Sequence, residues 1–137
     1  MNTHFLFLFG LYCSIFILCS FLGWIADDLY RRTVAGKDAP RIIPFIAPPY
    51  GFAALALVLI YFYIPVNPFF QVVLGTLAAI AIEFLSGVFC LKVYKRRLWD
   101  YSRSRFNLYG HVDLMHSCYW FASVFLVRWI VMLITGT

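Results

Sequence analysis

Four long apolar stretches alternate with shorter polar segments along the 137 residues. They predict spans at about residues 5–26, 49–64, 69–92 and 113–134, within a single membrane domain covering residues 1–137. About 20 apolar helical residues are needed to cross the hydrocarbon core of a bilayer. The pattern therefore predicts an all-α integral membrane protein with four transmembrane helices.

The second span is short and follows a segment that is broken by prolines. Residues 51–64 supply about 21 Å of helix, whereas the hydrocarbon core is about 30 Å thick. Just upstream lies the apolar run Ile42-Ile43-Pro44-Phe45-Ile46-Ala47-Pro48-Pro49, whose prolines exclude a regular helix. Two interpretations stay open. The run is either a bent, partly re-entrant entry packed inside the bundle, or a cytoplasmic loop lying on the bundle.

Basic residues are concentrated in two of the three connections. Ten of the eleven Lys and Arg residues lie there, namely Arg31, Arg32, Lys37, Arg41, Lys92, Lys95, Arg96, Arg97, Arg103 and Arg105. The positive-inside rule places both connections in the cytoplasm and both termini outside. We therefore expect a multi-pass protein of the plasma (inner) membrane, whose basic loops contact membrane lipids with anionic headgroups.

Composition agrees with this topology. The chain is 64% hydrophobic, 20% aromatic and only 12% charged, which is typical of membrane proteins and excludes a soluble globular chain. The net charge of +5 fits headgroup contact, so we expect no nucleic-acid partner. The four cysteines have no metal-ligand spacing, and no cofactor motif or phosphate-binding glycine loop occurs. We expect no metal, no cofactor and no nucleotide hydrolysis by this chain.

Glu83 lies within the third span and is the clearest candidate for function. An ionisable side chain at that depth costs about 2–4 kcal/mol unless it is paired or hydrated. Small and polar residues recur every four positions on its helical face, at Gly75, Ala79, Glu83 and Gly87. We expect this stripe to face protein and Glu83 to bind a substrate or an ion.

Two further polar lines predict the rest of the site. Span one carries Cys13, Ser20 and Asp27, and span four carries Asp113, His116, Trp120 and Ser123. We expect the three lines to surround a narrow polar interior that opens toward the cytoplasm, with Glu83 as its floor and Asp27, Asp113 and His116 as binding residues. The alternative is that these groups only make structural hydrogen bonds between helices.

Arg128 lies in the interior of the fourth predicted span. Its depth is several residues closer to the outer surface than that of Glu83. Pairing with Glu83 would need a long reach inward, and snorkelling outward is an equal alternative. We favour a structural role for Arg128.

The connection between spans three and four is rich in residues that make specific contacts. It contains Trp99, Asp100, Tyr101, Ser102, Asn107, Gly110 and His111. Asp100, Ser102 or Asn107 is suited to cap the helix that leads into span four, and Gly110 permits a tight turn. Capping does not explain an acid placed among six bases beside two aromatic residues. That pattern favours an ordered lid or a partner-docking surface.

Several short motifs carry a resemblance to a known family. They are Gly23-Trp24 with an acid three residues later, Tyr50-Gly51, Glu83-Phe84, and Trp99-Asp100-Tyr101-Ser102 followed by Phe106-Asn107 and Gly110. Through them residues 23–117 resemble the ABC-transporter type IV family, also called the CmpB-like permeases. Asp27 stands where that family usually has Glu, and His111 where it usually has Arg. The resemblance implies a permease-like role and adds Trp24 to the candidate binding residues.

Three functions follow as hypotheses. The first is a permease-like component of a transport system, forming a homo-oligomer and working with a separate ATPase or another membrane subunit. The second is a membrane-embedded lipid-headgroup enzyme or lipid-binding protein, in which Asp27, Asp113 and His116 act on a headgroup. The third is an assembly subunit of a larger membrane complex. The residues favour the first, and therefore a protein without enzymatic activity of its own.

Overall fold

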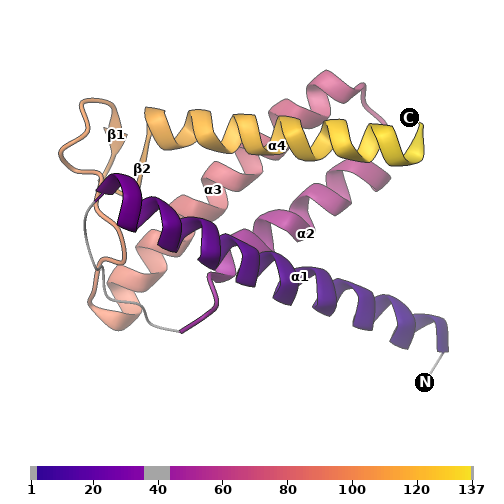
Figure 1. Cartoon of the computed structure of the whole chain (residues 1–137), viewed down its shortest axis with the longest axis horizontal. Helices are drawn as coiled ribbons and strands as arrows, with labels where there is room; N and C mark the ends of the chain where they lie inside the picture. The colour runs from indigo at the N-terminus through magenta and orange to yellow at the C-terminus, as the bar shows by residue number, and fades with distance from the viewer. Residues whose placement is uncertain (1–2, 36–43, 137) are drawn as a thin grey trace. The chain divides into compact units, whose positions relative to one another are not determined.

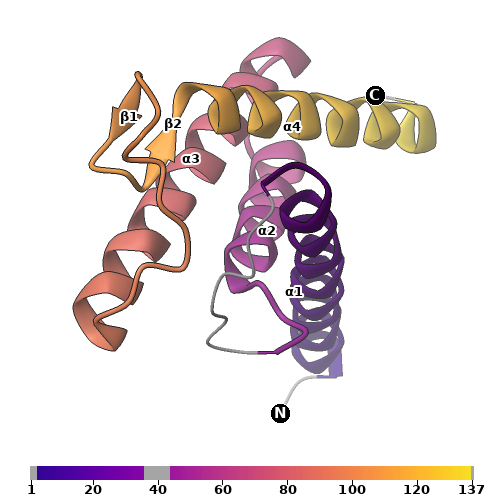
Figure 2. The ribbon, with the colours of Figure 1, turned by 60° about the vertical axis from the view of Figure 1, so that its left-hand side comes forward.

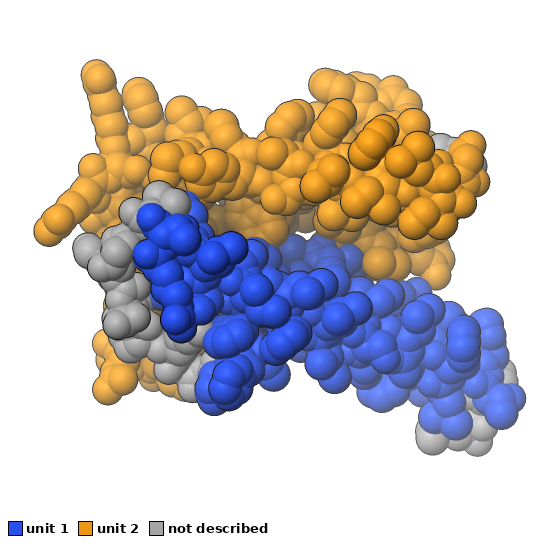
Figure 3. All heavy atoms as spheres, in the orientation of Figure 1, with its two compact units in different colours: residues 1–55 blue, residues 56–137 orange. Residues whose placement is uncertain are grey.

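The computed structural model describes residues 3–35 and 44–136 (Figure 1). Its elements are α1 (Thr3–Tyr30), the π-helical turn η1 (Arg31–Ala35), α2 (Pro48–Tyr63), α3 (Pro68–Tyr94), β1 (Asn107–Leu108), β2 (Val112–Asp113) and α4 (Leu114–Thr135). The chain forms two compact units, residues 1–55 and 56–137 (Figure 3). The single membrane domain stays a prediction.

Three helical stretches are long and apolar enough to cross a membrane. They are Thr3–Thr33 with 31 residues, Pro68–Tyr94 with 27 and Leu114–Thr135 with 22. The protein is therefore a helical membrane protein, as predicted. The fourth helix, α2, has 16 residues and a length of about 24 Å, less than the hydrocarbon thickness of about 30 Å. Its role as a span and the outside location of the termini stay predictions.

The proline-broken entry to α2 is confirmed in its described part. Pro44 and Phe45 form a turn in which Phe45 has a φ of 64°, and α2 begins only at Pro48. The amide of Ala47 donates to the carbonyl of Ser20 at 3.0 Å, so this segment is bonded to α1. Lys37, Arg41, Ile42 and Ile43 lie outside the described residues, and the depth of the entry in the membrane stays a prediction.

Two glycines let α1 and the start of α2 pack closely. A Cβ on Gly23 would overlap the ring of Tyr50, and a Cβ on Gly51 would overlap the hydroxyl of Ser20 and the ring of Phe16. Small residues at such crossings allow backbones to approach, which is how membrane helices gain packing energy. The Gly23-Trp24 and Tyr50-Gly51 motifs are therefore the two sides of one helix contact.

One face of α3 is buried over its whole length. It consists of Gln71, Val72, Gly75, Thr76, Ala79, Glu83, Gly87 and Cys90. The predicted small and polar stripe is thus confirmed as a protein-facing surface, and Leu77 on another face is 59% exposed. A Cβ on Gly75 would lie 2.6 Å from a Leu57 methyl and 2.9 Å from a Val124 methyl, so glycine brings α2 and α4 close to α3.

Arg128 has a structural role, as predicted, but through a partner that the sequence did not indicate. Its Nε donates to Oε1 of Gln71 at 2.7 Å, and the side chain is 6% exposed. Nε2 of Gln71 in turn donates to the carbonyls of Ile60, Tyr61 and Ile64, at 3.2–3.3 Å. The last carbonyls of a helix lack intrahelical donors and attract positive charge. Gln71 and Arg128 therefore stabilise the C-terminal end of α2, and Arg128 does not snorkel outward.

Candidate functional site

The α3–α4 connection is an ordered hairpin, whose two short strands were not predicted (Figure 2). β1 pairs antiparallel with β2, with Asn107 opposite Asp113 and Leu108 opposite Val112. Tyr109 and Gly110 in the turn have φ values of 53° and 74°. A Cβ on Gly110 would also lie 2.5 Å from the Ser102 hydroxyl oxygen. Both the backbone conformation and the space at this turn therefore require glycine at position 110.

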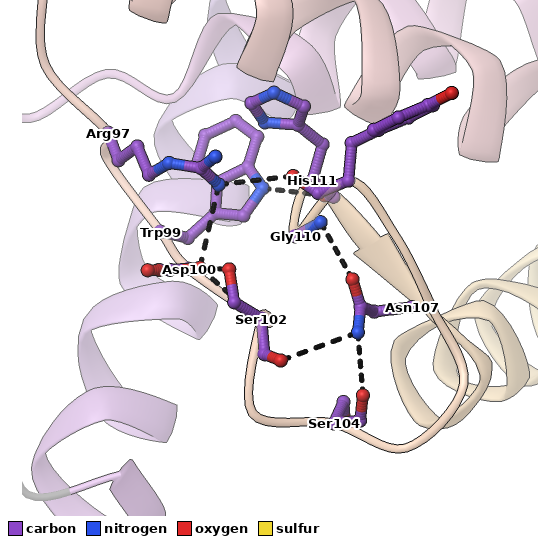
Figure 4. A network of polar contacts seen from close by, with 9 residues as sticks. Arg97, Trp99, Asp100, Ser102, Ser104, Asn107, Gly110 and His111 are labelled. Atoms are coloured by element: carbon purple, nitrogen blue, oxygen red, sulfur yellow. Dashed lines mark hydrogen bonds and ion pairs between the residues drawn. The ribbon is translucent and has the colours of Figure 1, made fainter.

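The polar residues of the Trp-Asp-Tyr-Ser motif hold the backbone of this hairpin (Figure 4). Asp100 accepts hydrogen bonds from the Ser102 hydroxyl and from the Ser102 amide, the latter at 2.9 Å. These two bonds, with a smaller contribution from Arg97, hold the pKa of Asp100 below its ordinary value. Trp99 Nε1 donates to the carbonyl of His111 at 2.8 Å. The motif therefore shapes the loop.

The side chain of Asn107 also holds the loop backbone, through two hydrogen bonds. Its Oδ1 accepts from the Gly110 amide at 2.8 Å, and its Nδ2 donates to the Ser104 carbonyl at 2.6 Å (Figure 4). Arg97 donates to the carbonyl of Tyr109 at 3.2 Å. The predicted motif residues Trp99, Asp100, Ser102, Asn107 and Gly110 thus form one network within the loop.

The prediction that Asp100, Ser102 or Asn107 caps the last helix is wrong. The N-cap of α4 is Asp113, whose Oδ1 accepts from the His116 amide at 2.8 Å. Asp100 and Asn107 accept from loop amides, the Ser102 hydroxyl donates to Asp100, and β2 separates all three from the helix. A residue directly before a helix is the one whose side chain reaches the first free amides.

His111 attaches the hairpin to α3. Its ring is buried at 4% exposure and packs edge-on against Phe84, with centroids 5.7 Å apart. A Cβ on Gly87 would lie 2.6 Å from its Nδ1, so the glycine makes room for the imidazole. Burial lowers the pKa of His111, and the positive charge of Arg97 lowers that pKa further. The buried ring therefore holds a proton less readily than a free histidine does.

Glu83 is 8% exposed, and each of its oxygens accepts a hydrogen bond from a neutral donor. The Tyr101 hydroxyl donates to Oε1 at 3.2 Å, and Trp120 Nε1 donates to Oε2 at 2.9 Å. Within residues 3–35 and 44–136 no ion pair involves Glu83, and Arg128 is bonded to Gln71 instead. Pairing of Glu83 with Arg128 is thus not observed.

A carboxylate–imidazole pair lies beside Glu83. The rings of His116 and Tyr101 are stacked, with centroids 4.0 Å apart and planes inclined by 18°. Nδ1 of His116 is 2.6 Å from Oδ1 of Asp113, and the Ser104 hydroxyl donates to the other oxygen of Asp113. Asp113 is 5% exposed. Three predicted site residues, Glu83, Asp113 and His116, are therefore brought together, connected by Tyr101.

Other parts of the predicted site are placed differently. Trp120 was grouped with the polar line of span four but not with the binding residues, although it lies one turn after His116 and binds Glu83. Ser104 was missed, because a polar loop serine two residues after Ser102 carries no distinguishing signal. Ser123 is exposed, and the buried face of α4 continues through Val124 and Arg128.

Asp27 and Trp24 belong to the first unit and have local partners there. Oδ2 of Asp27 is 2.8 Å from Nε of Arg31, one helical turn later. The Trp24 ring lies 5.1 Å from the Phe45 ring, centroid to centroid. Their participation in a site with Glu83 stays a prediction. In the described part of the chain, no group of three or more His, Cys, Asp or Glu residues is placed to hold a metal ion.

The apolar helices and the internal polar cluster define this chain as a polytopic helical membrane protein. Residues 14–137 match the family described as "Putative ABC-transporter type IV". The chain belongs to this family, and the resemblance inferred from the motifs is confirmed. Comparison with curated proteins and with solved structures finds no match. The family places the chain among transport-related membrane proteins.

Proposed function

We propose that the protein is a permease-like component of an inner-membrane transport system, and that Glu83 binds the transported cation or the cationic group of a solute. The supporting observation is the environment of Glu83. A carboxylate inside an apolar helix costs about 2–4 kcal/mol to bury without a partner. Tyr101 and Trp120 stabilise it through hydrogen bonds but carry no positive charge. A cation would supply the missing charge.

The neighbouring groups support the same proposal. Asp113 provides a second carboxylate, and His116 lies between Asp113 and the Tyr101 ring that contacts Glu83. Asp113 and His116 lie where the basic connection joins α4, and Tyr101 of that connection reaches back to Glu83 in the middle of α3. We therefore expect the ligand to reach Glu83 from the side of this connection, which the positive-inside rule makes cytoplasmic.

A complete transport system needs more than one copy of this chain. Four short helices enclose little space, so we propose a homo-oligomer. Since the sequence has no phosphate-binding glycine loop, we assign any nucleotide hydrolysis to a separate ATPase subunit.

The test is cation-dependent stabilisation of the purified full chain. Its unfolding temperature is measured in sodium, potassium, ammonium and tetramethylammonium chlorides at constant ionic strength. A ligand at 100 times its Kd stabilises the folded state by about 2.7 kcal/mol. We expect at least one salt to raise the unfolding temperature of the wild type, and Glu83→Gln to fold but lose this rise.

Asp100→Asn is the matched control for this test. It removes the same charge from an exposed acid of the loop and keeps the acceptor for the Ser102 amide. Asp100→Asn should show the same salt-dependent rise in unfolding temperature as the wild type. An equal rise in Glu83→Gln and in the wild type, or no rise with any of the four salts, would contradict the proposal.

One observation favours a second candidate, a lipid-headgroup enzyme. The contact between Asp113 and His116 has the geometry of a carboxylate that orients an imidazole as a general base. Vesicles that contain only the purified protein would be incubated and their lipids analysed by mass spectrometry. A new headgroup product that disappears in His116→Ala would favour the enzyme. Unchanged lipids would exclude activity of this chain on the lipids supplied.

A further inference from the structure

The α3–α4 connection folds back along α3 instead of extending beyond its end. From Glu83 to the last residue of α3, Tyr94, the helix rises by about 17 Å. Tyr101 follows that end by seven residues, and yet its hydroxyl lies 3.2 Å from Glu83. The Tyr109 ring is 6.5 Å from the Phe84 ring. Figures 1 and 2 both show the hairpin beside the first turns of α4, away from the last turn of α3.

This part of α3 lies at membrane depth. If the hydrocarbon core ended at Glu83, only Pro68–Ile82, about 22 Å of helix, would cross a core of about 30 Å. The residues after Glu83 are mostly apolar, and Leu85 and Phe89 are 63% and 54% exposed, as expected for side chains in lipid. A hairpin that packs at the level of Phe84 and Gly87 is therefore at or below the membrane surface.

The hairpin also meets the condition for irregular backbone at that depth, because its polar groups are bonded internally. The Tyr101 amide donates to the Gly110 carbonyl at 2.9 Å, and the Leu114 amide donates to the Phe106 carbonyl at 3.0 Å. Side chains of Arg97, Trp99 and Asn107 donate to further carbonyls. A loop in water does not need this degree of internal bonding, because water serves the same groups.

The tip of the hairpin has the chemistry of a membrane interface. Phe106, Leu108 and Tyr109 are 64%, 51% and 76% exposed, so they do not contribute to the protein core. Arg103 and Arg105 beside them are also exposed, and the Arg105 guanidinium lies 5.6 Å from the centre of the Phe106 ring. Aromatic residues flanked by arginines are enriched where acyl chains meet anionic headgroups.

We propose that residues 97–113 form a re-entrant hairpin of the membrane interface. Its tip residues Phe106, Leu108 and Tyr109 enter the adjoining leaflet, and Arg103 and Arg105 bind anionic phospholipid headgroups. The partner is a lipid surface because the exposed apolar tip continues the exposed apolar side of α3, with positive charge at its rim. This proposal does not depend on the permease role of Glu83.

The depth of the tip is measured on the full chain in lipid nanodiscs. The four native cysteines are replaced by alanine, and Leu108→Cys is labelled with a bimane fluorophore. Brominated phospholipids quench a fluorophore in lipid, and iodide quenches one in water. Leu77→Cys on the exposed face of α3 is the lipid reference, and Arg103→Cys is the matched loop position. We expect position 108 to be quenched by bromolipid nearly as strongly as position 77, and severalfold less by iodide than position 103.

Strong iodide quenching at position 108 without bromolipid quenching would overturn the proposal. A tip in water, or one that docks on a soluble protein partner, gives that result. Recovery of folded protein in the cysteine-free background is checked by gel filtration. If that background does not fold, Leu108→Trp in the otherwise native chain, compared with the unsubstituted chain by the same two quenchers, gives the same decision.

Headgroup selectivity is tested with brominated phosphatidylglycerol and brominated phosphatidylcholine, mixed with unbrominated lipid of the other kind. One basic side chain near an anionic surface contributes about 1 kcal/mol, or about fivefold in local lipid affinity. We expect label 108 to report a severalfold preference for the anionic lipid that falls toward unity in Arg103→Gln/Arg105→Gln. Lys95→Gln/Arg96→Gln, at the end of α3, is the charge-matched control and should keep the preference. An unchanged preference in the Arg103/Arg105 variant would overturn the headgroup assignment.

Discussion

The imidazole of His111 occupies the space that a side chain on Gly87 would need, with Nδ1 2.6 Å from the position of the missing Cβ. The contact joins α3 to the hairpin, and His111 is 4% exposed. Gly87 thus leaves the space on α3 into which the imidazole of His111, 24 positions later in the chain, packs.

Gly87→Ala should therefore destabilise the protein, although alanine is the better helix former by about 1 kcal/mol. The new methyl group must displace the imidazole or the backbone, at a cost of about 1–3 kcal/mol. Gly10→Ala is the matched control, because a Cβ there meets no described atom within 4 Å. Thermal unfolding in detergent should show a lower midpoint for Gly87→Ala and an equal or higher midpoint for Gly10→Ala. Equal midpoints for the two variants would contradict the packing at Gly87.

Tyr101→Phe should lower the free energy of unfolding, because it removes the hydrogen bond to Glu83 but keeps the ring stacked on His116. A buried hydrogen bond to a charged acceptor contributes about 1.5–3 kcal/mol. The same substitution in a Glu83→Gln background should cost less, because the acceptor is then neutral. A double-mutant cycle from chemical unfolding measures this difference. A coupling free energy near zero would mean that the Tyr101 hydroxyl bonds an amide at position 83 as strongly as the Glu83 carboxyl group, which would contradict a charged acceptor.

Stability should fall as the pH drops below the ordinary histidine range. Burial holds the pKa of His111 below its usual value of 6.5, so the unfolded chain binds the proton more readily than the folded one. The stabilisation is present above about pH 6.5 and is lost as the pH falls below it. His111→Gln removes the titrating group. Between pH 7.5 and 5, the unfolding temperature of the wild type should fall more steeply than that of the variant, and parallel curves would refute this assignment.

Gln71→Leu should be among the most destabilising changes in the second unit. It removes the donor to three carbonyls at the end of α2 and the acceptor of the buried Arg128. Unsatisfied buried polar groups cost about 1–3 kcal/mol each, and more when charged. Arg128→Met in the Gln71→Leu background should restore part of the lost stability. It removes the buried guanidinium whose acceptor on Gln71 has been deleted. Strict additivity of the two changes, measured by chemical unfolding, would argue against this shared role.

The helices of this protein follow from its sequence because apolar runs of 20 residues have few alternatives. The buried face of α3 was also predictable, since Gly75, Ala79, Glu83 and Gly87 share one side of a helix. The hairpin between α3 and α4 could not be predicted from the sequence. Its strands have two residues each, too few for an alternating pattern, and it is held by side chains of asparagine, aspartate and serine that cap helices equally well.

Site residues were predictable by type but not by partner. The cost of a buried charge singled out Glu83 from the sequence, whereas its donors Tyr101 and Trp120 lie 18 and 37 positions away. The same holds for Arg128, whose partner Gln71 is 57 positions earlier. Helical periodicity relates neighbours on one element, and it carries no information on which faces of separate elements meet.

The link from Gln71 to the end of α2 also bears on how the chain enters a bilayer. The carbonyls of Ile60 and Ile64 also accept from the amides of Ile64 and Val66, but Pro65 has no amide to offer Tyr61, whose carbonyl accepts from Gln71, a residue beyond the turn at Asn67. A helix of 16 residues is short for a span, and without Gln71 its Tyr61 carbonyl would need water, so α2 is poorly suited to insert by itself. We therefore expect α2 and α3 to enter the bilayer together, as a hairpin of two helices.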